Sequence, residues 1–373
     1  MAESTSLMFD VAYDLLDDFL LEFHRWGDLP ADVKLHILKY LTFPTLRGIM
    51  FLSKECYDLV RKIKPKVDIQ LEDAAFSAST KQRKLAKNHG VELHIYWRKP
   101  GAEFVHDYPL VFVKDSEEGC CVQRLIFEKG KLCKRPGTRY SSNTTTAATK
   151  AMFWLSKVLN IQATTVSMPS PNANLRAVLA EQSSSQKIAK ENFTVITDNE
   201  PLVTVDFLRF LKRGCGVSVV MKNGSTELFR GVELFDHEIF QCARKITFHG
   251  WKAELKDDQL INLAAEEICI TSPYITSGAI NKLILEWLDG KRRISSIRLG
   301  EMQTLDLKII LRNVDPTAIM LWEDFVKLTS YHWSWHFGIT PVSVIKGPQG
   351  FLILRTDKDT NSCHLVDYAY LTS

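Results

Sequence analysis

The sequence lacks several features that would settle its class at once. No apolar run approaches the roughly 18 residues that a membrane-spanning helix needs. Neither sign of charge dominates, because 47 Lys and Arg stand against 44 Asp and Glu, giving a net charge of +3. This small excess gives no reason to expect a nucleic acid or an anionic membrane as partner. Apolar residues make up 45% of the 373 residues, so the chain can build two or three globular modules.

The first 25 residues lack the basic start that a signal peptide requires, since they carry six acids against Arg25 alone. Apolar residues from Phe9 to Phe23 recur at helical spacing, which predicts an acidic amphipathic helix over residues 1–25. It would cover the next module or dock on a basic partner. Because no signal peptide is recognised, we expect an intracellular protein, in the cytoplasm, the nucleus or both.

The eight cysteines are too irregularly spaced for a disulfide framework, and we expect reduced, mostly buried thiols. Cys120, Cys121 and Cys133 have no second pair of the CxxC type to complete a zinc site. Cys120-Cys121 also has no identifiable base partner, so the sequence does not support a thiol nucleophile.

A pair of closely spaced histidines could also bind a metal ion. His332 and His336 flank Trp333-Ser334-Trp335 and could share a helix face, with Glu323 or His364 as a third metal ligand. We favour an aromatic edge that packs the terminal strands. No metal and no cofactor is expected.

The motifs of P-loop nucleotide binding, α/β-hydrolases, zinc proteases and protein kinases are all missing. The sequence therefore gives no argument for an active site, and we expect a protein that is not an enzyme. An enzyme with its site in the α/β region is the alternative. A deep polar pocket containing carboxylates or histidines with perturbed pKa values would favour it.

Residues 29–60 predict three short helices. Pro30 suits the start of a helix because its missing N–H costs nothing there, and Asp32 suits the positive helix N-terminus. Pro44 separates the first helix from the second, and Ser53 is a plausible N-cap for the third. So short a segment cannot bury its own apolar surface. That surface needs a partner chain or the rest of this one.

This segment resembles an F-box, and we place that domain at residues 26–65. The resemblance rests on Leu29-Pro30, Asp32-Val33, Ile37-Leu38, Leu41, Leu46, Leu52-Ser53-Lys54 and Leu59-Val60. It implies binding to a Skp-family adaptor and, through it, to a cullin. The implied adaptor-binding residues are Leu29, Pro30, Val33, Ile37, Leu38, Leu41, Leu46 and Leu52. The alternative is a generic helical hairpin.

The next segment, residues 66–90, is expected to be a basic linker, because residues 61–87 carry eight basic side chains against three acids. Beyond it, residues 91–97, 110–114 and 122–128 are rich in strand-forming residues, and residues 141–149 are expected to be a loop. We place one domain at residues 91–338. Its larger part repeats a unit made of a strand and a helix. Short strand-like runs begin near residues 164, 193, 217, 245, 267 and 295, with helical patterns between them.

That spacing lies in the range of leucine-rich-type repeats and predicts a strand–helix solenoid, in which neighbouring units share one core. Residues 163–299 would form one mainly parallel sheet with helices on one side. A doubly wound α/β domain, with helices on both faces, is the alternative. Residues 339–373 are expected to form a C-terminal β-hairpin cap. The fold class is therefore α+β or α/β, with an F-box, a leucine-rich-repeat-like solenoid and a hairpin in order.

Residues 279–290 and 294–299 resemble the F-box-associated region of the large nematode F-box families, through Asn281-Lys282 and Trp287-Leu288-Asp289-Gly290. The two resemblances together imply a substrate-recognition subunit of a Skp–cullin–F-box ubiquitin ligase, with an unknown protein target held by the C-terminal domain. An adaptor that takes no part in ubiquitin transfer is a further alternative.

Strand alternation predicts which side chains would meet the target. Apolar positions must face the core, which turns the alternate residues outward. The outward candidates are Thr247, His249, Cys269, Thr271, Ser296 and Arg298. Recognition there would rely on hydrogen bonds, with Arg298 as the main charged contact. The alternative is a solvated face without a partner.

Overall fold

The structure is a computed structural model, and it divides into two compact units, Met1–Phe193 and Thr194–Ser373. It describes residues 26–41, 43–50, 52–76, 90–98, 105–117, 119–128, 131–169, 172–198, 202–222, 228–229, 232–329 and 342–372. The helix expected over residues 1–25 and the segment from His332 to His336 lie outside this range, as do residues 77–89 of the expected linker.

Three short helices open unit 1, as the sequence predicts: α2 (Ala31–Leu38), α3 (Phe43–Met50) and α4 (Lys54–Ile63). Pro30 immediately precedes α2. The Ser53 hydroxyl accepts a hydrogen bond from the Cys56 N–H at 3.1 Å and so caps the N-terminus of α4. At the other end of α4, Lys64 has a positive φ of 46° and ends the helix.

The sheet of unit 1 has the order β5-β4-β3-β2-β1-β6. Neighbours from β1 to β5 pair antiparallel, while β1 and β6 pair parallel. Helix α5 (Thr144–Val158) packs on β1, β2 and β3, and α6 (Ala173–Glu181) follows β6. The strands are β1 (Lys66–Asp73), β2 (Gly90–Arg98), β3 (Val105–Lys114), β4 (Cys120–Glu128), β5 (Lys131–Tyr140) and β6 (Asn160–Ser167).

Two local expectations in unit 1 are wrong. Residues 66–73 form the inner strand β1 instead of a linker, because Val67, Ile69 and Leu71 alternate with polar residues and bury on one face. The linker was expected from the basic residues of 61–87, and that argument did not consider the alternation of apolar and polar residues in this strand. In the expected loop at residues 141–149, α5 begins at Thr144, because Asn143 accepts a hydrogen bond from the Thr146 N–H at 2.9 Å and the alanines that follow favour a helix.

Unit 2 is built on parallel strands. Strands β8 (Gly216–Met221), β10 (Lys245–Ala253), β11 (Glu267–Thr271) and β12 (Ser296–Gly300) pair parallel in that order, and the short β9 (Leu228–Phe229) also pairs with β10. Strand β7 (Asn192–Thr197) spans the division between the units. The helices between these strands are α7 (Leu202–Leu208), α8 (Val232–Phe235), α9 (Glu238–Gln241), α10 (Asp257–Asn262) and α11 (Ser277–Leu288).

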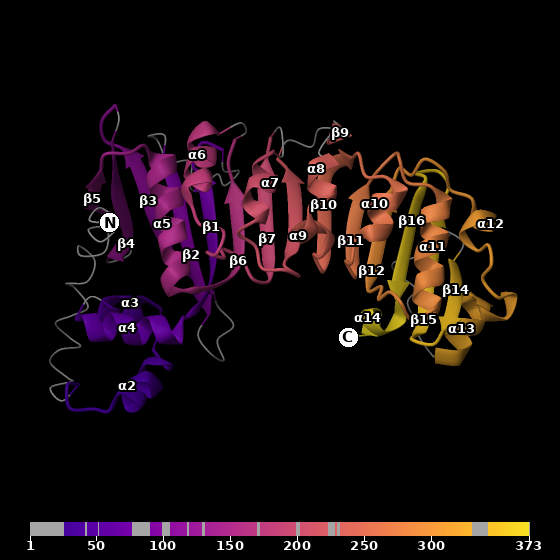
Figure 1. Cartoon of the computed structure of the whole chain (residues 1–373), viewed down its shortest axis with the longest axis horizontal. Coiled ribbons are helices and arrows are strands. Elements are labelled where there is room, and N and C mark those ends of the chain that lie inside the picture. Colours follow the sequence, from indigo (N-terminus) through magenta and orange to yellow (C-terminus); the bar gives the residue numbers. More distant parts are fainter. Residues whose placement is uncertain are drawn as a thin grey trace. The chain divides into compact units, whose positions relative to one another are not determined.

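Figure 1 shows α7, α9, α10 and α11 on the same side of these strands, as predicted from the strand–helix repeat. The mixed α/β class is confirmed, but the leucine-rich-repeat-like solenoid is not, because the sheet is not curled. Solenoid curvature requires the same small rotation at every repeat. The repeats here are unequal, since α8 and α9 have 4 residues each whereas α11 has 12.

The C-terminal strands close the parallel array. Strand β16 (Ser362–Asp367) pairs antiparallel with both β12 and β15 (Gly350–Asp357), so the expected hairpin is present and covers the edge of β12. Strands β14 (Val342–Gly347) and β13 (Ile319–Leu321) extend the sheet antiparallel. The remaining elements are α12 (Leu307–Ile310), the 3-10 turn η2 (Pro316–Ala318), α13 (Trp322–Thr329) and α14 (Tyr368–Thr372).

Candidate functional site

The three N-terminal helices divide their apolar residues between the interior of unit 1 and the solvent. Leu38 and Leu46 are buried, with exposed fractions of 0% and 3%. Val33 is 38% exposed and Pro30 is exposed. The remaining adaptor-binding candidates are partly exposed: Leu29, Ile37, Leu41 and Leu52. Helix α2 and its flanks therefore present an incompletely covered apolar strip, whereas Leu38 and Leu46 pack inward.

Helix α3 anchors this segment on the sheet of unit 1. The Phe43 ring lies 5.7 Å from the Trp97 ring on β2 and 6.4 Å from the Tyr108 ring on β3, measured between centroids. Arg47, buried with 6% exposure, donates a hydrogen bond to the Tyr108 hydroxyl and lies over its ring. These contacts attach α3 to the sheet, whereas α2 packs on α4.

A buried lysine, Lys34, ties α2 to α4. Only 4% of its side chain is exposed. Its ammonium donates to Glu55 Oε1 at 2.9 Å and to the Gly27 carbonyl at 3.4 Å, and lies 5.8 Å from the Trp26 ring centroid. A buried ammonium needs such partners. Sequence reasoning missed Lys34 because a lysine on a short helix ordinarily faces water.

These three helices lie in the part of the chain that matches a known family. Residues 26–68 match the F-box domain family model. The chain carries an F-box. The match begins where the sequence prediction placed the domain and ends three residues later, in β1. Comparison with curated proteins and with solved structures finds no match to the chain. Within the described residues, no helix combines the length and apolarity needed to cross a membrane.

A second candidate surface lies on the strands of unit 2, where burial follows the expected alternation. Core-facing residues have exposed fractions of 0–3%: Ile246, Phe248, Ile268, Ile270, Ile297 and Leu299. On the other face, Cys269 of β11 pairs with Thr247 of β10 and with Arg298 of β12. His249 and Arg298 are exposed, Thr271 and Ser296 are half-buried, and Thr247 is 7% exposed.

Two neighbouring hollows bring these side chains together. One, of about 220 Å³, is lined by Thr247, His249, Ser296 and Arg298 among others. The other, of about 380 Å³, is lined by Thr271 and Arg298 together with residues of β15 and β16. Arg298 borders both. All six outward candidates, Cys269 included, therefore line one or the other hollow on this polar face.

Sequence reasoning missed the contribution of β15 and β16 to the larger hollow. Arg355, Asp357, Ser362 and His364 line it because β16 adds to the edge of β12, where Arg298 pairs with His364. The hairpin itself was predicted from its turn. Its place as a cap was expected as well, but the register that sets His364 opposite Arg298 was not, because nothing local in residues 350–367 specifies it.

Two arginines, Arg298 and Arg355, act on a largely buried histidine of this face. Burial, followed by the charges of Arg298 and Arg355, lowers the pKa of His364 to about 4. Its Nε2 lies 3.1 Å from the Ser296 hydroxyl. The hydrogen bond with Glu267 at 2.7 Å raises the pKa of Lys245 above its ordinary value. The arginines suit partners that present anionic or hydrogen-bond-accepting groups.

The cysteine candidates behave as structural thiols. Cys120 and Cys121 are free, and burial raises the pKa of Cys120 to about 12. A thiol with that pKa is protonated at neutral pH and is a poor nucleophile. The side chain of Cys133 lies outside the described residues.

Proposed function

We propose that this chain is the substrate-recognition subunit of a Skp–cullin–F-box ubiquitin ligase. The F-box supports a role as an adaptor or substrate receptor of such ligases in general, and F-box proteins are typically non-catalytic. In the proposal, the F-box binds the Skp-family adaptor and through it a cullin. Unit 2 holds a protein target. The chain then acts inside the cell, in the cytoplasm, the nucleus or both.

The observation that carries the proposal is the uncovered apolar strip of α2. Leu29, Pro30, Val33, Ile37 and Leu41 all keep exposed surface although α3 and α4 are packed. Apolar anchors that are exposed in the free chain and become buried in a complex supply much of the free energy of association. The strip also coincides with positions of the F-box motif.

The role requires no catalytic residues in this chain. A receptor that holds its target beside a recruited conjugating enzyme raises the effective concentration of target lysines, and that alone accelerates transfer. The hollows around Arg298 are the proposed target surface. The likeness of residues 279–299 to the F-box-associated region of nematode F-box families supports this assignment, and we propose that unit 2 belongs to that class.

The adaptor interface is tested by a pair of exposed valines. Val33→Asp places a carboxylate in the strip, while Val105→Asp makes the same change on β3, where the valine is 50% exposed. Titration calorimetry with a purified Skp adaptor should show at least a 30-fold weaker affinity for Val33→Asp, since a hot spot contributes about 2 kcal/mol or more. Val105→Asp should bind like the unaltered chain. Equal affinity of the two variants would contradict the interface.

Ubiquitin transfer separates the proposed receptor from an adaptor that takes no part in it. A ligase reconstituted with this chain, the adaptor, the cullin and a co-purified target should ubiquitinate that target. Val33→Asp should abolish the reaction. Binding without transfer in the complete system would favour the non-transferring adaptor.

A further inference from the structure

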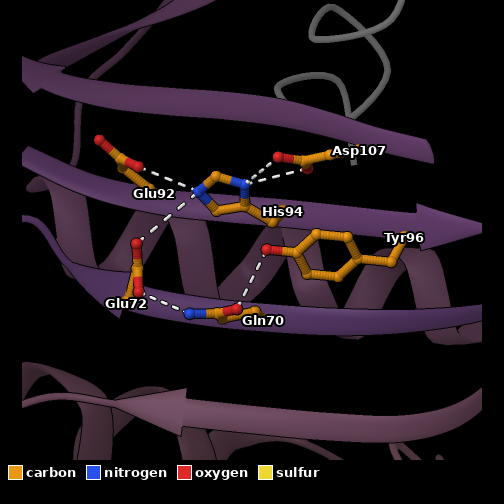
Figure 2. A network of polar contacts seen from close by, with 6 residues as sticks. All are labelled: Gln70, Glu72, Glu92, His94, Tyr96 and Asp107. Atoms are coloured by element: carbon orange, nitrogen blue, oxygen red, sulfur yellow. Dashed lines mark hydrogen bonds and ion pairs between the residues drawn. The ribbon is translucent and has the colours of Figure 1, made fainter. Parts of the chain in front are cut away.

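A buried polar cluster in unit 1 lies apart from both proposed binding surfaces. It consists of Glu72 on β1, Glu92 and His94 on β2, and Asp107 on β3; we call it the His94 cluster. Glu72, Glu92 and His94 are 3%, 2% and 2% exposed. Figure 2 shows both glutamates pointing at one nitrogen of the imidazole and Asp107 at the other. The proposed function uses none of these side chains.

Strand register forces the two buried glutamates together. Glu72 pairs directly with Glu92 across β1 and β2, while His94, two residues along β2, has its side chain on the same face. Like charges directly opposite each other destabilise a strand pair. Burial makes the repulsion worse, because a buried carboxylate needs a compensating cation. A cation bound between the two carboxylates would relieve this repulsion.

A proton on His94 is one such cation, but it supplies a single positive charge against three carboxylates. A divalent metal ion balances the charge better. Its two charges equal those of Glu72 and Glu92, and Asp107, whose side chain is 42% exposed, stays paired with the imidazole Nδ1–H.

The atoms facing one another have the spacing of a metal site. His94 Nε2 lies 3.0 Å from Glu92 Oε2 and 3.8 Å from Glu72 Oε1, and one ligand atom from each residue falls within 4.8 Å of the others. Tetrahedral zinc with bonds of about 2.0–2.1 Å holds its ligands roughly 3.3 Å apart. The measured distances fall on either side of that value. The imidazole nitrogen and the two carboxylate oxygens are each atoms that zinc accepts as ligands.

Neighbouring residues hold the ligands in the orientation that a metal requires. Both Asp107 carboxylate oxygens lie 3.0 Å from His94 Nδ1, which leaves Nε2 turned toward the glutamates. The Gln70 amide donates to Glu72 Oε2 at 2.6 Å and accepts from the Tyr96 hydroxyl at 3.1 Å, leaving Glu72 Oε1 directed at His94. Carboxylate-supported histidine ligands of this kind are characteristic of zinc sites.

We propose that Glu72, Glu92 and His94 bind a Zn²⁺ ion, with Asp107 as the residue that positions His94. The ion would fasten β1 to β2. Strands β2 and β3 also carry Trp97 and Tyr108, on which the F-box helix α3 packs. Zinc binding would therefore stabilise the platform of the F-box. This inference does not depend on the ubiquitin-ligase assignment.

The test uses the full-length chain stripped with a chelator, then titrated with Zn²⁺ and separately with Co²⁺. We expect one equivalent of Zn²⁺ to bind, the thermal midpoint to rise, and bound Co²⁺ to show d–d absorption. Glu92→Gln and His94→Gln should lose all three responses. Asp107→Asn should keep the stoichiometry with an affinity about 10–100-fold weaker. Glu117→Gln, an exposed glutamate in the turn after β3, is the matched control and should match the unaltered chain.

Two results overturn the proposal. One is the absence of specific Zn²⁺ binding to the folded unaltered chain, which would leave the proton on His94 as the balancing charge. The other is unchanged Zn²⁺ binding in Glu92→Gln and His94→Gln, which would place the metal elsewhere. Circular dichroism verifies folding, and Glu72→Gln replaces His94→Gln if the latter does not fold, because it changes a ligand with little change of shape.

Discussion

At the scale of single residues, close packing and charge decide which positions tolerate change. Gly347 on β14 is an example of packing. A Cβ atom at this position would lie 2.5 Å from Trp287 Cζ3 and 2.7 Å from Trp287 Cη2. Trp287 is completely buried in α11 and cannot move aside easily. The absence of a side chain at residue 347 is therefore a condition for α11 to pack on this end of the sheet.

Gly347→Ala is accordingly expected to destabilise the protein by about 1–3 kcal/mol, the usual cost of overpacking. Chemical denaturation followed by circular dichroism measures it. Gly48→Ala in α3 is the control, because its Cβ would meet nothing within 4 Å and alanine favours a helix by up to about 1 kcal/mol. Equal stability of the two variants would contradict the packing argument.

His364 gives a prediction about pH. Its pKa is lowered to about 4 by burial and by Arg298 and Arg355, whereas an unfolded histidine titrates near 6.5. Between these values the unfolded chain binds a proton that the folded chain does not. Stability from the neutral histidine is therefore complete above pH 6.5 and is lost as the pH falls toward 4, by about 3 kcal/mol in all.

Comparing unfolding free energies of the unaltered chain and His364→Gln at pH 7, 5.5 and 4.5 tests this prediction. The difference in stability between the two proteins should shift steadily in favour of His364→Gln as the pH falls. Asp357 lines the same hollow and is identical in both proteins, so its contribution cancels to first order. A difference that stays constant across the series would show that the histidine titrates normally.

At the scale of elements, hydrogen bonds at helix ends fix how neighbouring repeats of unit 2 join. Arg292 follows α11, and its side chain is 10% exposed. Its Nε donates to Glu286 at 2.9 Å, while its other nitrogens donate to the carbonyls of Leu263 and Ile261 at the end of α10. A cation at a helix C-terminus satisfies carbonyls that have no partner within the helix. One residue thereby joins α10 to α11.

Arg292→Met should cost about 3 kcal/mol of stability, because it removes one partner of a mostly buried ion pair and leaves two carbonyls without donors. The adjacent Arg293 is exposed, so Arg293→Met should change stability by no more than about 0.5 kcal/mol. Urea denaturation of both variants measures the contrast. A similar small loss in each would refute the joining role of Arg292.

At the scale of the whole molecule, the proposed function assigns one kind of partner to each unit. The α2 strip belongs to unit 1, and the hollows around Arg298 belong to unit 2. Each surface is built from residues of its own unit. The two interactions should therefore be lost separately.

Affinity purification with two baits tests this separation. The double variant His249→Ala/Arg298→Ala should lose the target while keeping the adaptor and cullin. Val33→Asp should show the reverse pattern. A double change of exposed arginines in unit 2, Arg293→Ala/Arg312→Ala, controls for the loss of positive charge and should keep every partner. Retention of every target by the His249/Arg298 variant would place target binding elsewhere.

The sequence by itself determined the features that depend on local pattern. Pro30 and Ser53 precede α2 and α4 as expected, because helix-start preferences act within a few residues. Pro44 lies in the first turn of α3, where its missing N–H costs nothing, and Phe43 before it is helical. Alternation in β10, β11 and β12 was likewise sufficient to separate core positions from outward positions such as Arg298. The mixed α/β class followed from the rhythm of strands and helices.

Only the tertiary structure decided which residues of neighbouring strands lie opposite each other. Pairing of β16 with β12 brings His364 beside Arg298, and pairing of β1 with β2 brings Glu72 opposite Glu92, although 20 residues separate them in the chain. Sequence reasoning sought metal ligands among cysteines and closely spaced histidines, and so missed the His94 cluster. Strand register is set by nonlocal packing and hydrogen bonding, and a shift of one residue would turn these side chains to the opposite face.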